Sequence, residues 1–298
     1  MNLQENYKIS SFWYTPKGYN GIGLMEILTI KSWLDHGYKF HLYTYNLEDK
    51  IFLKFQELFD NFILKDANEI IPFEEYFSDD RGAGVASFSD FFRYNLLYLR
   101  GGVWVDLDMV CLNFYDYKQD YIFNSEFAKN NEQAITNSFL KFPKQSEFGK
   151  LLIEEAKKIV DDNKIIPWGI IGPWFLAKWV KEYDLEKHAL DYKDTCQISC
   201  GNTRDFIDKK NFDENRLCLH LFSEMWRIYK MNKNHFYKSC IYGFLLQKHN
   251  ILDLCLKLNY NLSFCDKHYD KFLPFINIKN KIRFYFRHPK KIFKKNNA

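Results

Sequence analysis

Residues 87–112 read SFSDFFRYNLLYLRGGVWVDLDMVCL, and this stretch does most to decide the fold. Either Ser87 or Ser89 is suited to cap a helix that runs to about Leu99, because serine is favoured just before a helix. The two glycines that follow end the helix, since glycine readily takes the left-handed conformation found there. From Val103 the pattern becomes apolar and strand-like, which predicts a central buried strand interrupted by two acids.

The chain before this stretch alternates between strand-like and helix-like patterns. The predicted strands are Lys8 to Tyr14, Phe40 to Tyr45 and Phe62 to Leu64, and the predicted helices are Met25 to His36 and Glu48 to Phe59. This order is typical of a parallel sheet covered by helices. The segment Ser78 to Ala86, with DDRGAG, is expected to be a flexible loop.

The chain after this stretch is predicted to be mainly helical. We expect a helix at Phe148 to Val160, a loop IIPWGIIGPWF that enters a helix near Trp174, and a strand at Arg216 to Phe222. From about Phe236 the pattern looks helical and carries no strong catalytic motif. The expected organisation is therefore one α/β domain over residues 1–230 and a helical extension over 231–298.

Composition and charge exclude some classes of function. A net charge of +4 is small against 42 basic and 38 acidic side chains, so no global field of the kind that defines a nucleic-acid binder exists. The first residues lack the pattern of a secretory signal, and no run approaches the roughly 18 apolar residues of a membrane span. We therefore expect a cytoplasmic protein. The sequence makes no prediction about oligomeric state.

The positive excess is concentrated in residues 279–295, where Lys and Arg alternate with Phe, Ile and Tyr and no acid occurs. Such a tail is a candidate for peripheral contact with the inner face of the cell membrane. A solvated final helix is the alternative for this segment. A non-enzymatic membrane-surface binding module is the alternative for the whole chain, although it leaves the two acids of the predicted strand unexplained.

Seven cysteines without any CxxC pair fit a reducing compartment and buried free thiols. Cys196, Cys200, Cys218 and His220 can be arranged into a zinc site, but their spacing matches no standard pattern. Core packing is therefore the preferred interpretation of these residues.

Asp106 and Asp108 lie two apart in the predicted strand, so their side chains leave the same side, with Cα atoms about 6 to 7 Å apart. Two carboxylates in a hydrophobic strand are costly unless a cation or hydrogen bonds compensate them. Mn²⁺ or Mg²⁺ prefers such oxygen ligands and commonly completes its shell with substrate phosphates. The pair therefore predicts a diphosphate bridged to the protein through a metal. A strand end whose acids face solvent is the alternative.

Asp90 and Arg93 are three apart on the helix that leads into this strand, and so share one face of it. Beside the carboxylate pair, they are candidates to grip ribose, phosphate or sugar hydroxyls. A surface salt bridge is the alternative.

The stretch from Ser89 to Val110 resembles the DxD region of the family 32 glycosyltransferases. The family pattern is a Ser-Asp, an Arg three on, a Leu-Tyr, a Gly-Gly pair and an aromatic before Asp-x-Asp. It is met here by Ser89, Asp90, Arg93, Leu97, Tyr98, Gly101, Gly102, Trp104, Asp106 and Asp108.

Weaker correspondences extend this resemblance over most of residues 1–230. The family's first strand ends in an aromatic that stacks on the nucleotide base, which SSFWY matches with Trp13 and the adjoining Tyr14. Its Gly-Pro in a loop that faces the acceptor is similar to Gly172 and Pro173. A late His followed by a Trp is matched by His220 and Trp226. The resemblance makes His220 a further metal or diphosphate ligand, with Ser223 or Glu224 as alternatives.

The resemblance implies a GT-A fold, in which a Rossmann-like, mostly parallel sheet flanked by helices binds the nucleotide at its strand ends. It implies a retaining hexosyltransferase that takes sugar from a nucleotide diphosphate donor, by default a UDP-hexose. The acceptor would be a growing surface glycan such as bacterial capsule or lipooligosaccharide. Asp106, Asp108, Asp90 and Arg93 would be catalytic, and Trp13, Tyr14, Asp90, Arg93, Trp104, Gly172 and Pro173 would bind the donor. Asp106, Asp108 and His220 would hold Mn²⁺ or Mg²⁺.

A different enzyme class fits the same residues. VWVDLDMV satisfies the DxDx[TV] opening of the haloacid dehalogenase phosphatases, with Asp106 as nucleophile and Asp108 as acid or base. Those enzymes resemble one another in placing the motif on the first strand, whereas here it is preceded by several predicted elements.

Overall fold

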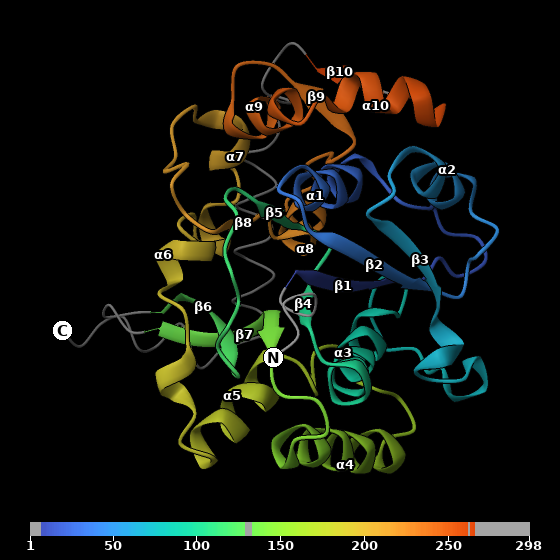
Figure 1. The fold of residues 1–298 in the computed structure, drawn as a ribbon, viewed down its shortest axis with the longest axis vertical. Helices are drawn as coiled ribbons and strands as arrows, with labels where there is room; N and C mark the ends of the chain where they lie inside the picture. Colours follow the sequence, from blue (N-terminus) through green and yellow to red (C-terminus); the bar gives the residue numbers. More distant parts are fainter. Residues whose placement is uncertain (1–6, 129–132, 262, 266–298) are drawn as a thin grey trace, which may run out of the picture.

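The computed structural model describes residues 7–128, 133–261 and 263–265, and a six-stranded mixed sheet lies at its centre (Figure 1). The strand order is β3-β2-β1-β4-β7-β6, in which neighbours among the first four strands are parallel and β7 is antiparallel to β4 and β6. The strands are β1 (Lys8–Trp13), β2 (Lys39–Thr44), β3 (Phe62–Asp66), β4 (Val103–Val105), β6 (Ile122–Phe127) and β7 (Gln133–Lys141).

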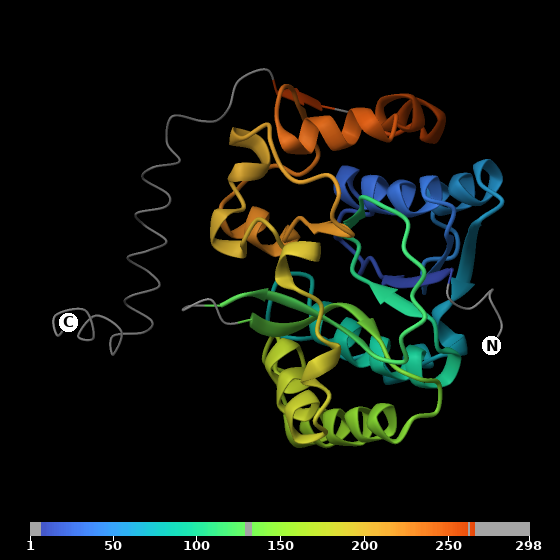
Figure 2. The ribbon, with the colours of Figure 1, turned by 60° about the vertical axis from the view of Figure 1, so that its left-hand side comes forward.

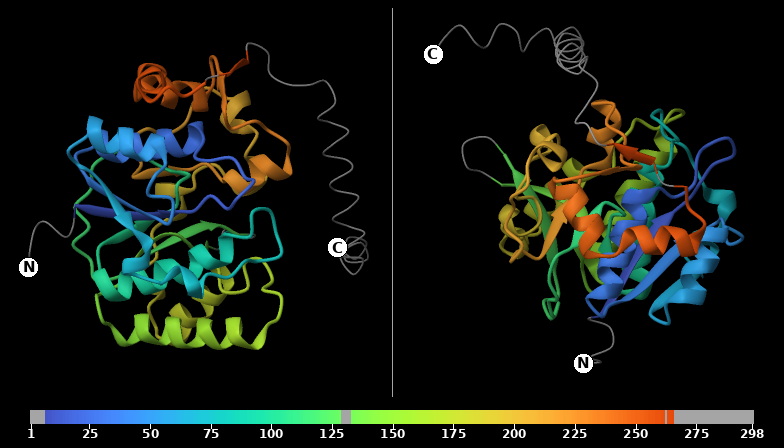
Figure 3. Two further views of the ribbon diagram at one scale, coloured as in Figure 1. Left: turned by 90° about the vertical axis from the view of Figure 1, so that its right-hand side faces the viewer. Right: turned by 90° about the horizontal axis from the view of Figure 1, so that it is seen from above.

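Helices cover both faces of this sheet, which confirms the predicted α/β class (Figure 3). Side chains alternate along a strand, so Val103 and Val105 join one hydrophobic cluster while Trp104 joins the other. The first cluster includes residues of α1 (Leu24–Asp35), α2 (Lys50–Leu58), α9 (Ile241–Lys248) and α10 (Ile251–Leu258). The second includes residues of α3 (Ala86–Arg100), α4 (Glu147–Asp162) and α5 (Pro173–Glu182).

The remaining elements are short. Two further sheets have two strands each, β5 (Met109–Cys111) with β8 (Cys218–His220), and β9 (His235–Tyr237) with β10 (Ser263–Cys265). The short helices are α6 (Tyr192–Thr195), α7 (Asp205–Asp208) and α8 (Ser223–Ile228). Single 3-10 turns occur at Ala67–Glu69, Phe73–Glu75, Glu186–His188 and Cys200–Asn202.

The deciding helix α3 forms as predicted, but its start differs. Ser87 and Ser89 lie inside the helix, which has Val85 at its N-cap without a side-chain hydrogen bond. The prediction of a serine cap is therefore wrong. Asp79 from the preceding loop takes over this role, because its Oδ2 accepts a hydrogen bond from the Ser87 N–H at 2.8 Å. The helix ends at Gly101, where φ is +62°, as predicted.

The C-terminal part contains the predicted helices α9 and α10, and also the strands β9 and β10, which were not predicted. Figure 2 shows α9 and α10 beyond α1, on the side of the sheet away from α4. Leu245 and Ile251 pack in the same cluster as Leu28 of α1. The division into residues 1–230 and 231–298 stays a prediction, and the basic tail at 279–295 lies outside the described residues.

None of the helices within 7–128 and 133–261 combines the length and the apolar character that a membrane crossing requires.

His41 gives the sheet a pH-dependent stability. Burial, together with the charges of Lys8, Lys65 and Lys39, lowers the pKa of His41 from 6.5 to about 4. Between these values the unfolded chain binds a proton that the folded chain does not, so His41 destabilises the fold as the pH falls from 6.5 to 4. We expect the melting temperature of His41→Gln to fall less than that of the wild-type chain as the pH is lowered from 6.5 to 4. An unchanged profile would contradict the assignment.

Candidate active site

Asp106 and Asp108 lie in a turn between two short strands of different sheets. The predicted single strand through both acids is wrong, because β4 ends at Val105 and the Met109 N–H donates a turn hydrogen bond to the Asp106 carbonyl at 3.0 Å. Asp106 still extends the large sheet, through its N–H to the Ser138 carbonyl at 2.8 Å. Asp108 belongs to the other sheet, where its carbonyl accepts the Leu221 N–H at 2.8 Å.

Arg93 lies between two carboxylates, Asp90 and Asp106. Its Nη2 is 3.0 Å from Asp90 Oδ1 and 3.2 Å from Asp106 Oδ1, and its guanidinium lies 4.9 Å from the centre of the Trp104 ring. The Trp104 indole N–H donates to Asp106 Oδ1 at 2.8 Å. Asn137 joins the network, since its side-chain N–H donates to Asp90 Oδ1 at 2.8 Å and its carbonyl accepts from Arg93. The alternative of a surface salt bridge is wrong, because the Asp90 and Arg93 side chains are only 9% and 5% exposed.

Burial sets the ionisation of these carboxyls. It raises the pKa of Asp90 to about 6, although the positive charge of Arg93 opposes the rise. Burial also raises the pKa of Asp106, again against the charge of Arg93. Arg93 is thus the main group that keeps both carboxyls ionised.

Asp108 is held by the segment around β8. Its Oδ2 accepts the Ser223 N–H at 2.7 Å, and its Oδ1 lies 3.4 Å from His220 Nε2. Burial opposes ionisation, yet the charge of His220 and the Ser223 hydrogen bonds outweigh it and lower the pKa of Asp108. In turn, Asp108 raises the pKa of His220 against the effect of burial. Oδ1 of Asp108 is buried, and its contact with His220 is longer than a typical hydrogen bond.

The other ring nitrogen of His220 faces a different group of side chains. Nδ1 lies 3.8 Å from Cys196 Sγ and 4.0 Å from Glu126 Oε1. The ring therefore separates the aspartate turn from a second set of polar groups.

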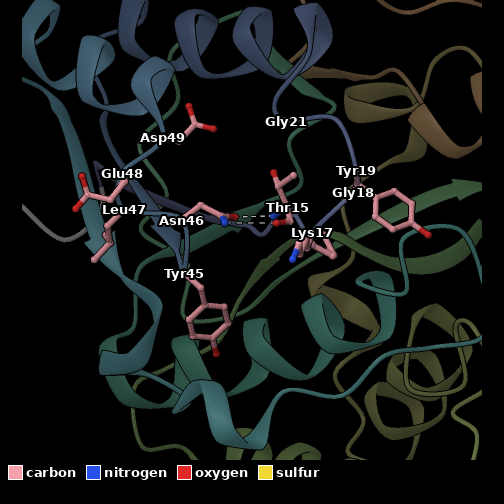
Figure 4. A pocket seen from close by; sticks show the side chains of 11 residues that line it. Thr15, Lys17, Gly18, Tyr19, Gly21, Tyr45, Asn46, Leu47, Glu48 and Asp49 are labelled. Carbon is pink, nitrogen blue, oxygen red and sulfur yellow. Dashed lines mark hydrogen bonds between the residues drawn. The ribbon is translucent and has the colours of Figure 1, made fainter.

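A pocket of about 570 Å³ opens beyond the carboxyl ends of β1 and β2 (Figure 4). It is lined by residues 15–19, Gly21 and residues 45–49. Its two walls are joined where the Thr15 N–H donates to Asn46 Oδ1 at 2.6 Å. Trp13, half-buried, directly precedes this lining and donates its indole N–H to Thr15 Oγ1 at 2.8 Å.

The remaining predicted residues are divided between the site and its surroundings. Gly172 adjoins the site, since a Cβ at this position would lie 2.9 Å from Asp90 Oδ2. Pro173 begins α5 directly after it. Tyr14 lies in an aromatic cluster, 5.0 Å from Tyr76 between ring centres. Trp226 is buried in the core and donates its indole N–H to the Leu221 carbonyl.

Sequence reasoning missed Asn137 and Glu126 as partners of the site, and it grouped Cys196 with His220 but preferred core packing for both. A signal for Asn137 exists, because the polar run Thr136, Asn137 and Ser138 separates apolar residues of β7 and is buried. No local pattern singles out Glu126.

The chain matches a known class of protein over part of its length. Residues 25–128 match the family model described as a glycosyltransferase sugar-binding region containing a DXD motif. The matched segment ends beyond Asp106-Leu107-Asp108, and it confirms the prediction of a glycosyltransferase. Membership of family 32 stays a prediction.

Several solved structures are similar to the chain. The PaToxG glycosyltransferase has 15% identity and a TM-score of 0.45, covering 61% of this chain and 70% of its own. Glycosyltransferase GlyE of Streptococcus pneumoniae TIGR4 has 12% identity and a TM-score of 0.42, covering 85% and 62%. The UDP-bound glycosyltransferase domain of the YGT toxin has 9% identity and a TM-score of 0.41, covering 93% and 97%. No curated protein sequence matches the chain.

Proposed function

We propose that the chain is a retaining glycosyltransferase that moves a sugar from a nucleotide diphosphate sugar, by default a UDP-hexose, to a growing surface glycan such as capsule or lipooligosaccharide. The observation that carries the proposal is the aspartate turn, in which the buried Oδ1 of Asp108 has the His220 ring 3.4 Å away and no closer donor among the described residues, while Asp106 lies two residues before it. Two buried carboxylates this close in the chain are costly unless cations compensate them, and a divalent ion would compensate both. The location proposed is the cytoplasm, with peripheral membrane contact through residues 279–295.

The residues present fit a hard divalent ion, Mn²⁺ or Mg²⁺. Asp106 and Asp108 supply carboxylate oxygens, and the Asp106 side chain is 28% exposed, which leaves room for substrate phosphates. His220 Nε2, beside Asp108, is the proposed third ligand. When bound, the ion would neutralise the charge that develops on the departing diphosphate.

The chain's own residues would orient the donor. Arg93 holds Asp90 and Asp106 in one network, so Asp90 is fixed by Arg93 and Asn137 and can accept hydrogen bonds from sugar hydroxyls. Trp104 fixes Asp106 through its indole N–H. The acceptor hydroxyl would approach the same face of the donor sugar from which the diphosphate leaves, on the side of Gly172 and Pro173.

The nucleotide base is proposed to occupy the pocket beyond β1 and β2, where Trp13 and Tyr14 lead into its lining. Asn46 and Thr15 fix the two walls of the pocket to each other through two hydrogen bonds. The pocket lies at the carboxyl ends of parallel strands, the edge at which α/β sheets commonly bind nucleotides.

A thermal-shift panel tests this proposal with UDP and GDP, each with and without Mn²⁺. We expect one nucleotide to raise the melting temperature only when Mn²⁺ is present, because the ion joins the phosphates to the aspartates. At a ligand concentration of 100 times Kd the stabilisation is about 2.7 kcal/mol. The absence of a shift with either nucleotide would contradict the proposal. Hydrolysis of a generic phosphate ester without such a shift would favour the phosphatase alternative.

A further inference from the structure

A second group of metal-type ligands lies on the far side of His220 from the aspartate turn. Glu126 comes from β6, Cys196 directly follows α6, and His220 ends β8. One ligand atom of each lies within 4.8 Å of the other two. Among the described residues, this is the group of at least three His, Cys, Asp or Glu side chains whose ligand atoms all lie within 4.8 Å of one another.

The surroundings of Cys196 differ from those of a thiol that merely fills a core. Its Sγ is buried, yet it faces polar groups: Asn124 Nδ2 donates to it at 3.6 Å, Thr195 Oγ1 lies 3.7 Å away and His220 Nδ1 lies 3.8 Å away. An N–H that points at a sulfur fixes the direction of the sulfur's lone pairs, with which it binds a metal. The site thus has the supporting hydrogen bond that metal ligands commonly carry.

We propose that Glu126, Cys196 and Nδ1 of His220 bind a Zn²⁺ ion. Zinc accepts sulfur, nitrogen and oxygen ligands together, in contrast to Mg²⁺ and Mn²⁺, which prefer oxygen. Bond lengths of about 2.0 to 2.3 Å in a tetrahedral shell place ligand atoms roughly 3.3 to 3.8 Å apart. His220 Nδ1 lies 3.8 Å from Cys196 Sγ and 4.0 Å from Glu126 Oε1, and all three ligand atoms lie within 4.8 Å of one another, so binding the ion requires the group to contract.

The Glu126 side chain, 22% exposed, provides the route by which the ion enters. A water molecule entering by the same route would complete a tetrahedral shell. Of the set Cys196, Cys200, Cys218 and His220 considered from the sequence, only Cys196 and His220 belong to this group, whereas Cys218 packs in the core as preferred.

The zinc site goes beyond the proposed sugar transfer and does not depend on it. It takes Nδ1 of His220 and leaves the proton on Nε2, which faces Asp108, so with zinc bound a hard ion at the aspartate turn would be held by Asp106 and Asp108 without this ring. An ion on Nδ1 would tie β6, α6 and β8 together and fix the direction in which Nε2 points. The expected consequence is a higher melting temperature when Zn²⁺ is added.

Titration of the reduced full chain with Co²⁺ tests the proposal, because a cobalt–thiolate bond gives a near-ultraviolet charge-transfer band that oxygen ligands do not give. We expect the wild-type chain to develop this band at one equivalent. Cys196→Ser should abolish it. Glu126→Gln should weaken Co²⁺ binding by about 10- to 100-fold.

Two variants serve as matched controls. Cys255→Ser removes another buried thiol, in α10, and Asp108→Asn removes a ligand of the proposed hard-ion site; both should keep the band. The rise in melting temperature on adding Zn²⁺ should likewise be lost in Cys196→Ser and reduced in Glu126→Gln. It should be kept in Cys255→Ser and Asp108→Asn.

The proposal is overturned if the wild-type chain gives no thiolate band, or if Cys196→Ser keeps it. Should Cys196→Ser fail to fold, Glu126→Gln decides, since unchanged Co²⁺ affinity in that variant also overturns the proposal. No nucleotide is present in these titrations, so failure of the proposed sugar transfer leaves their outcome unaffected.

Discussion

Asp108→Asn is expected to lower metal-dependent sugar transfer by at least about a hundredfold, on the scale of removing one group that stabilises transition-state charge. The substitution removes a negative charge and almost no volume. An amide can still accept the Ser223 N–H through its oxygen, so the turn itself is preserved. The lost group is the anionic, buried oxygen that lies 3.4 Å from His220 Nε2.

Initial rates with donor and acceptor, together with melting temperatures in Mn²⁺ and UDP, measure this effect. The variant should keep its melting temperature in the absence of ligand to within a few degrees and lose the shift that Mn²⁺ and UDP produce together. Asp161→Asn is the control, because it removes an exposed carboxylate on α4 that pairs with Lys157 in the preceding turn. Full turnover of Asp108→Asn would contradict the proposed role.

Arg93→Met is expected to destabilise the fold by about 3 to 5 kcal/mol at pH 7, the usual cost of leaving buried charges without their partner. Arg93 is buried and contacts both Asp90 and Asp106. Methionine fills a similar volume but supplies no charge, so both carboxyls lose the group that holds them ionised. Urea unfolding measures the change.

The free energy of unfolding that Arg93→Met loses should depend on pH, and the direction of this dependence follows from the pKa values of Asp90 and Asp106. Burial already raises the pKa of Asp90 to about 6, and removing Arg93 raises the folded-state pKa values of Asp90 and Asp106 further. The unfolded chain releases these protons near pH 4, so folding becomes less favourable as the pH rises from 4 to 7. The destabilisation should therefore be smaller at pH 5 than at pH 7.

Two variants complete this test. Arg204→Met breaks an exposed pair with Asp208 and should cost no more than about 1 kcal/mol. Adding Asp90→Asn to Arg93→Met should restore part of the lost stability, since it removes one of the stranded charges. An equal loss at pH 5 and pH 7 would contradict the account of the network.

The sequence predicted well those features that depend on neighbours in the chain. The period of apolar residues located α1, α2 and α4, and the two glycines after α3 marked its end. The order of these elements was enough to predict the parallel half of the sheet. The aspartate spacing, with Asp90 and Arg93, correctly indicated one cluster, although the backbone between the acids turns and does not run straight.

Features built from distant segments could not be predicted in this way. Glu126, Cys196 and His220 come from three elements, and β6, which carries Glu126, was not anticipated. The prediction of a serine N-cap for α3 was wrong for the same reason, because Asp79 reaches the start of the helix from a loop. Asn137 meets Asp90 only because β7 lies beside β4 in the sheet.

The turn at Asp106 to Asp108 joins two separate sheets, one that forms the body of the molecule and one that reaches to α8. Each sheet therefore contributes one of the two carboxylates. A ligand bound by both carboxylates would therefore contact the two sheets at once and restrain one relative to the other. Because Asp108 also accepts the Ser223 N–H, binding of the donor would restrain the Ser223 segment as well.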